Sequence, residues 1–201
     1  CLYVALKRGP MGIVSPITAV MSAAIPVFFG LLNGERLNLL AVIGMISAAI
    51  AVILVSQEVN AHQKIAFSTI AISLTSGSLI GSYLTLIGTS SDDSGIWTAT
   101  IARWFSSILV LGAVLATVRK FERSSYPWLL VIISGVLDAA ANGIFQIATQ
   151  NGMLAIVAVL GSLYPATTAL LARFILHERL HKIQITGVVL ALAAAVALTL
   201  S

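Results

Sequence analysis

Long apolar runs separated by short polar segments fill the chain, and this pattern predicts membrane-spanning helices. A helix crosses about 30 Å of hydrocarbon with about 20 apolar residues, and its backbone hydrogen bonds are then all made internally. The runs are far longer than barrel strands and lack the alternation of apolar and polar residues that such strands show. Seven complete spans are predicted, at Met11–Leu32, Leu39–Val55, Ile65–Ile87, Trp97–Val118, Pro127–Thr149, Met153–Leu176 and Ile183–Leu200, and Leu2–Leu6 is expected to end an eighth.

The composition supports an all-α integral membrane protein. Of the 201 residues, 59% are hydrophobic and only 9% are charged, and the mean hydropathy is +1.04. A soluble domain carries about 25% charged residues, so an ordinary soluble protein and a disordered one are both excluded. Cys1 is the single cysteine, which excludes a disulfide framework and a thiolate metal site. The net charge of +4 is too small to indicate a nucleic-acid-binding face.

The first residue is Cys1, not Met, and it opens in the middle of an apolar run. No secretory signal is recognisable there, because a charged leading segment and a small-residue cleavage site are both missing. We therefore expect the sequence to be a fragment whose beginning lies upstream.

Basic residues in the loops predict the orientation in the membrane. Arg36 is the basic residue of one side, and the other side has Lys7, Arg8, Lys64, Arg119, Lys120, Arg123, Arg179 and Lys182. The positive-inside rule makes the second side cytoplasmic and places Ser201 outside.

The chain contains an internal repeat at an offset of 143 residues. Glu35-Arg36-Leu37 aligns with Glu178-Arg179-Leu180, and the match needs no gap over about 50 residues. Five spans, an odd number, separate equivalent points, so the second copy must cross the membrane in the opposite direction. Inverted repeats of this kind are typical of secondary transporters, whose two halves rock about a site near the midplane.

The sequence resembles the drug/metabolite transporter superfamily, specifically its EamA-type domain. The resemblance rests on the segment Ala5 to Pro10, on Gly34-Glu35-Arg36-Leu37, on Gly44, on Val136 to Ala139 with Asn142, on Leu163 to Thr168, on His177-Glu178-Arg179-Leu180 and on Gly187. It implies two inverted five-helix repeats, ten helices in all, of which residues 1–58 end the first repeat and residues 59–201 form the second. Glu35, Arg36, Pro165, Glu178 and Arg179 are its structural motif residues. Ser22 stands where the second copy has Pro165, which could move a kink by one turn.

The resemblance implies a secondary transporter, an exporter of small metabolites such as amino acids, that works by alternating access in the cell membrane. It implies no enzyme activity and no cofactor; the expected partners are a small-molecule substrate, the lipid bilayer and a proton as the candidate coupling ion. No phosphate-binding loop is present, so ATP-driven transport is not expected. The alternatives are a facilitator without ion coupling and an assembly subunit without transport activity of its own.

Asp138 is the strongest candidate for a substrate-contacting residue. It falls at the midpoint of a predicted span, where a charge costs a few kcal/mol or more unless it faces water or the bundle interior. Asn142 and Gln146 follow on the same helical face. Partial burial favours the neutral form of a carboxyl, so Asp138 is expected to bind a proton, a cationic substrate group, or each in turn. The alternative is a hydrogen-bonded cluster that holds helices together.

Other polar positions in the spans are more ambiguous. Arg103 lies about two turns into its span, where it could extend to the interface or face the cavity. Serine and threonine in membrane helices usually bond their own backbone carbonyls, so most hydroxyls are expected to be structural. The remaining candidates for the cavity are Tyr83, Tyr164, Thr167, Ser15, Thr18 and Ser22.

His177-Glu178-Arg179-Leu180-His181 matches the H-E-x-x-H pattern of zinc proteases. The first copy of the repeat has Gly34-Glu35-Arg36-Leu37-Asn38 at the same place, so Glu-Arg-Leu belongs to the repeat. The segment also lies between two predicted spans, and no third ligand follows it. An intramembrane zinc protease is therefore kept only as a distant alternative, and no metal is expected.

Overall fold

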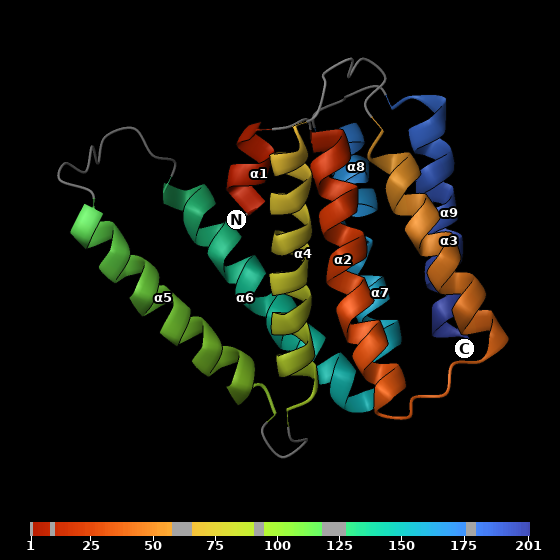
Figure 1. The fold of residues 1–201 in the computed structure, drawn as a ribbon, viewed down its shortest axis with the longest axis horizontal. Coiled ribbons are helices and arrows are strands. Elements are labelled where there is room, and N and C mark those ends of the chain that lie inside the picture. The colour runs from red at the N-terminus through yellow and green to blue at the C-terminus, as the bar shows by residue number, and fades with distance from the viewer. Residues whose placement is uncertain (1, 9–10, 58–65, 91–94, 118–127, 176–179) are drawn as a thin grey trace. The chain divides into compact units, whose positions relative to one another are not determined.

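Every element of the described chain is a helix in the computed structural model shown in Figure 1. The structure describes residues 2–8, 11–57, 66–90, 95–117, 128–175 and 180–201. The helices are α1 (Leu2–Arg8), α2 (Met11–Leu32), α3 (Leu39–Val55), α4 (Phe67–Gly88), α5 (Trp97–Thr117), α6 (Trp128–Asn151), α7 (Leu154–Ser162), α8 (Tyr164–Ile175) and α9 (Lys182–Thr199).

The described residues of the predicted membrane spans are helical, except at their ends and where one span is divided into two helices. Six stretches of the described chain are long and apolar enough to cross a membrane: Ile13–Leu32, Phe67–Gly88, Trp97–Ala116, Trp128–Asn151, Leu154–Ile175 and Lys182–Thr199. The remaining predicted span, Leu39–Val55, is apolar but has only 17 residues. At 1.5 Å per residue it is about 25 Å long, slightly less than the hydrocarbon thickness.

The predicted span Met153–Leu176 is two helices, α7 and α8, that meet at Leu163. Pro165 is the second residue of α8 and has no N–H to donate to the preceding turn. The Leu163 N–H instead donates to the Leu160 carbonyl at 3.2 Å. In the first copy, α2 contains Pro16 and Pro26 and is nevertheless assigned as one helix. The interruption therefore belongs to the second copy alone.

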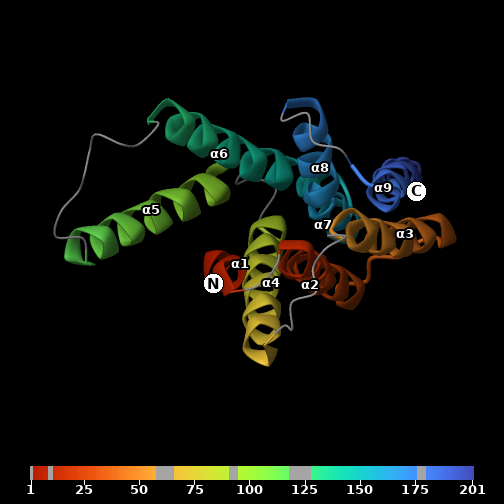
Figure 2. The same ribbon diagram turned by 90° about the horizontal axis from the view of Figure 1, so that it is seen from above.

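The chain divides into two compact units, Cys1–Leu86 with Gly152–Ser201 and Ile87–Asn151. The first holds α1 to α3, most of α4, and α7 to α9, and the second holds α5 and α6. The predicted boundary between residues 58 and 59 stays a prediction, because this grouping follows the packing of helices and not the repeat. Within the first unit α3 lies along α9, and α2 lies along α7 (Figures 1 and 2).

Small residues let α3 and α9 approach closely. A Cβ added at Gly44 would lie 2.9 Å from Leu198 Cγ, and one added at Gly187 would lie 2.7 Å from the Val55 backbone nitrogen. Lipid is as apolar as the side chains, so no hydrophobic force drives membrane helices together. Small residues at their interfaces allow close van der Waals packing instead. The buried core around this contact consists of Ala19, Ala23, Ala48, Ala51, Val52, Val55, Val159, Leu163, Ala166, Val188, Ala191, Ala194 and Leu198.

The first unit carries an approximate twofold relation at the offset found in the sequence. Adding 143 to the first residues of α2 and α3 gives the first residues of α7 and α9, Leu154 and Lys182. The contact between Gly44 and Leu198 likewise has an equivalent between Val55 and Gly187. Reciprocal pairs of contacts are the signature of a twofold interface. The 143-residue offset therefore recurs in the helix beginnings and contacts of the first unit, and the two five-helix repeats stay a prediction.

The close approach predicts unequal costs for two glycine substitutions. Gly187→Ala pushes a methyl group against the Val55 backbone, which cannot move without bending α3. Gly44→Ala meets the buried Leu198 side chain first, and side-chain atoms shift more readily than the backbone of a helix. We expect Gly187→Ala to destabilise the protein by about 1–3 kcal/mol and Gly44→Ala, the matched control, by less. Thermal unfolding in detergent measures the difference, and equal or reversed costs would contradict the described packing.

Candidate functional site

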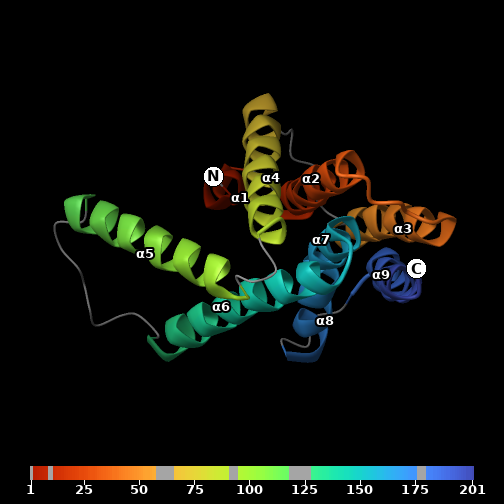
Figure 3. The same ribbon diagram turned by 90° about the horizontal axis from the view of Figure 1, so that it is seen from below.

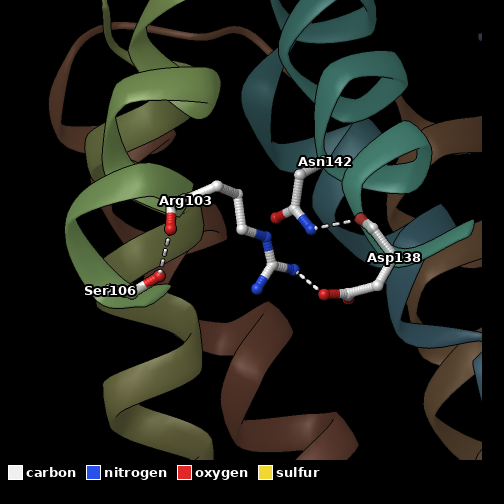
Figure 4. Close-up of polar contacts among 4 residues, drawn as sticks. All are labelled: Arg103, Ser106, Asp138 and Asn142. Carbon is white, nitrogen blue, oxygen red and sulfur yellow. Dashed lines mark hydrogen bonds and ion pairs between the residues drawn. The ribbon is translucent and has the colours of Figure 1, made fainter. Parts of the chain in front are cut away.

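A charged pair joins the two helices of the second unit. Arg103 on α5 extends across to α6, where its Nη2 forms an ion pair with Asp138 Oδ2 (Figure 4). The exposed fractions of the two side chains are 36% and 58%, so neither is sealed inside protein. Large apolar side chains of the same helices, among them Ile101, Trp104 and Leu137, are also exposed, as expected where a helix faces lipid.

The surroundings of the pair leave hydrogen-bonding capacity unused. Asn142 follows Asp138 by one helical turn, and its Nδ2 donates to the Asp138 backbone carbonyl at 2.7 Å. Figure 4 shows this amide beside the guanidinium group. The Ser106 hydroxyl donates to the Arg103 backbone carbonyl at 3.0 Å. Arg103 Nε is buried and has no hydrogen-bond partner in the described part of the chain. An unpartnered N–H of this kind can donate a hydrogen bond to a ligand oxygen.

A cavity of about 550 Å³ lies between α5 and α6. Ligand pockets for small molecules typically measure about 300–1,000 Å³ and combine apolar walls with a few polar groups. This one has Arg103, Thr100 and Ser107 as its polar lining, and its other lining residues are Ile96, Ala99, Trp104, Ala139, Ala140, Gly143, Ile144 and Ile147. The cavity is open on one side and can hold an amphipathic molecule with one end at Arg103.

Gln146 is on the predicted face of α6, but its contacts are those of a structural residue. It is completely buried. Its Oε1 accepts from the Ala99 N–H at 2.9 Å, in the first turn of α5, and its Nε2 donates to Ser90 Oγ at 3.0 Å. One turn later, Gln150 Nε2 donates to the Gly95 carbonyl at 3.0 Å. The two glutamines fasten the beginning of α5 to α6, and the proposed site therefore excludes Gln146.

The remaining candidates all belong to helices of the first unit. The hydroxyls of Thr18 and Ser22 are buried and donate to backbone carbonyls of their own helix, at 2.7 and 2.8 Å. Thr167 likewise donates to the Tyr164 carbonyl at 2.9 Å. These bonds match the structural role expected for hydroxyls in membrane helices.

Two tyrosines complete the set of candidates in the first unit. The Tyr164 hydroxyl lies 3.4 Å from the Ser15 backbone carbonyl, so α8 and α2 meet at this point. Tyr83 is half-buried on α4, with its hydroxyl oxygen inside the protein. Ser15 itself is buried. The structure thus brings Ser15 and Tyr164 together, and separately Arg103, Asp138 and Asn142.

In the second copy of the repeat, Glu178 and Arg179 of the Glu-Arg-Leu motif fall outside the described residues, as does His177 before them. In the first copy Glu35 and Arg36 are described, in the segment between α2 and α3. His181 comes immediately before the first residue of α9, so the H-E-x-x-H match is not contained in a described helix. Among the described residues, no group of three or more His, Cys, Asp or Glu side chains is placed to hold a metal ion.

The comparisons with known proteins agree with this helical architecture. The model of the EamA-like transporter family matches residues 67–200, more than half of the chain. One solved crystal structure of a protein shares 19% sequence identity with this chain. The TM-score is 0.72, and the match covers 99% of this chain and 72% of that one. At this identity the likeness concerns the fold alone. No match is found among curated proteins.

The contacts of Gln146 predict that its loss affects stability. Gln146→Leu leaves the buried Ala99 N–H without an acceptor, which costs about 1–3 kcal/mol. Asn142→Leu is the matched control, because Asn142 bonds only the carbonyl of its own helix in the described contacts. Thermal unfolding in detergent is expected to show a lower midpoint for Gln146→Leu than for Asn142→Leu. Equal midpoints would mean that Gln146 does not fasten α5 to α6.

Proposed function

Because this chain belongs to the EamA-like transporter family, we propose that it carries a small amphipathic metabolite across the membrane by alternating access, with the Arg103–Asp138 pair contacting the substrate. The family consists of transporters, and the chain is a multi-pass membrane protein with the helices such a protein needs. The observation that carries the proposal is a partly exposed ion pair inside two apolar spans, beside a cavity of about 550 Å³.

The pair must face water or substrate because of the cost of charge in hydrocarbon. Charged side chains within membrane segments almost always face the bundle interior or an aqueous cavity, and they commonly mark substrate and ion pathways. Arg103 is partly exposed and lines the cavity, and the exposed Asp138 carboxylate is paired with it.

The chemistry of the pair favours a substrate with both charges, such as an amino acid. A guanidinium group offers planar paired donors that suit a carboxylate. A carboxylate such as Asp138 can accept hydrogen bonds from an ammonium group. Trp104 and Ile144 are apolar lining residues that would contact the remainder of such a molecule. A zwitterion can therefore replace the ion pair with two new pairs and leave no charge without a partner.

We further propose that a proton is the coupling ion and that the direction is export from the cell across the cell membrane. A single carboxylate that binds either a proton or an ammonium group couples their movements, because the two compete for it. Among the described residues, Arg103 is the charged group that contacts Asp138. The family resemblance supports export, and the charge distribution of the loops supports an orientation with Ser201 outside.

The role of Asp138 predicts the effect of removing its charge. Asp138→Asn keeps the shape of the side chain but removes the partner of Arg103, so we expect transport to fall at least about tenfold while the protein still inserts and folds. The residual transport is expected to lose its dependence on pH. Uptake of a labelled amino acid mixture into proteoliposomes of the full-length protein, measured across pH, tests both expectations.

Ser106→Ala serves as the control, because the Ser106 hydroxyl contacts the backbone of Arg103 and not its charge. It is expected to transport at the normal rate. An unchanged rate and pH profile in Asp138→Asn would contradict the proposed role of Asp138. Normal transport that is independent of pH in the unmodified protein would favour the uncoupled facilitator.

A further inference from the structure

The Glu35 carboxylate connects two distant parts of the first unit. Glu35 lies in the segment between α2 and α3, and its Oε1 accepts from the Leu154 N–H at 2.7 Å. Its Oε2 accepts from the Ala155 N–H at 3.0 Å. Both donors are in the first turn of α7, about 120 residues further along the chain. We call this set of two hydrogen bonds the Glu35 latch.

The latch satisfies a helix end that has no cap of its own. The first N–H groups of a helix have no partner within it, and they form the positive end of the helix dipole. The residue before α7 is Met153, whose side chain makes no capping hydrogen bond. Glu35 lies between α2 and α3 and supplies the negative charge and the acceptors that α7 lacks. It does so through two charge-assisted hydrogen bonds.

The neighbouring chain leaves room for the carboxylate. A Cβ added at Gly30, in the last turns of α2, would lie 2.3 Å from Glu35 Oε2. Glycine at this position thus provides the space in which the carboxylate reaches α7. The Glu35 side chain is half-buried, so water can replace the N–H groups as its partner when the contact opens.

The latch lies at one end of the contact between α2 and α7, two helices at equivalent places in the repeat. Buried residues of α2 and α7 are small: Ala19 and Ala155 are apolar, and Thr18, Ser22 and Ser162 donate to carbonyls of their own helices. Membrane helices associate through van der Waals packing and interhelical polar contacts, so the loss of a polar contact at one end of a pair can favour separation there. A charge-assisted polar contact at one end gives the pair two discrete arrangements, latched and open. In the view from below, α2 and α7 lie next to each other (Figure 3).

We propose that Glu35 is a positioning residue of the transport cycle: the Glu35 latch closes one membrane face of the protein and must open for the substrate to pass on that face. This inference rests on the proposed alternating access. It concerns a residue outside the Arg103–Asp138 pair and acts through the position of α7. In an inverted repeat, equivalent contacts fall at opposite membrane faces, and opening at one face accompanies closing at the other.

The test measures water access to α7 from each side of the membrane. Ser162 is buried near the end of α7 and lines a cavity of about 160 Å³ with residues of α2 and α3. A cysteine placed there, in full-length protein whose native cysteines, Cys1 included, are replaced by serine, reports entry of a charged maleimide that cannot cross the bilayer. The label is added to either side of oriented vesicles, and folded protein is isolated by gel filtration before the labelling rate is read.

Two variants open the latch by different means. Glu35→Gln removes the charge and one of the two acceptors. Gly30→Ala keeps the charge but places a methyl group where the carboxylate lies, so the flexible side chain is displaced. Arg36→Gln, which changes an exposed charge in the same segment, is the control. If Glu35→Gln does not fold, Gly30→Ala decides the question alone.

Both latch variants are expected to label at least about fivefold faster than the unmodified protein, and only from the face on which Glu35 lies, because each loses about one charge-assisted hydrogen bond. Arg36→Gln is expected to label at the normal rate. Unchanged labelling in both variants, or equal acceleration from both faces, would overturn the proposal, since a purely structural contact produces no sidedness.

The labelling requires no substrate, so its result is separate from that of the proposed function. One-sided acceleration supports the latch even if the tested amino acids are not transported, in which case the proposed substrate class is wrong. Unchanged labelling in a protein that transports amino acids overturns the latch and leaves the proposed function in place.

Discussion

A charge or a polar backbone group inside hydrocarbon must have a partner, and the arrangement of this protein depends on that constraint. It requires helices for every span, since only a helix satisfies its own backbone. It also makes the polar contacts between helices important for stability. Arg103 meets Asp138 between α5 and α6, Gln146 meets the beginning of α5, and Glu35 meets the beginning of α7. Each contact satisfies groups that lipid could not.

Between these polar contacts the helices meet through small residues. The approach of Gly44 to Leu198 and of Gly187 to Val55 lets α3 and α9 pack closely. Dispersion between closely packed backbones is the main attraction available to helices that lipid surrounds. Such a pair forms a stable support, whereas the polar contacts at helix ends can exchange partners with water. The division suits a protein in which some contacts must change and others must stay.

The spans could be predicted from the sequence because hydropathy and length determine them almost alone. The partners of polar residues could not, since partners come from the packing of helices distant in the chain. Asp138, Asn142 and Gln146 share one helical face, yet Asp138 meets an arginine while Gln146 caps another helix. The pairing of Arg103 with Asp138 has no signal in the sequence, since nothing in their spacing connects them. The Glu35 contact with Leu154 had a signal in the repeated Glu-Arg-Leu, but its partner had none.

The central claim is that the Arg103–Asp138 pair contacts the substrate and does not merely join α5 to α6. Exchanging the two charges, as Arg103→Asp with Asp138→Arg, separates these roles, because the exchange preserves an ion pair but reverses its direction. The decisive measurement is amino acid uptake by proteoliposomes that contain this double variant of the full-length protein, with its thermal stability measured alongside. We predict normal stability and loss of transport, since each charged end of the zwitterion then meets a residue of the same charge. Normal transport together with normal stability would contradict the claim.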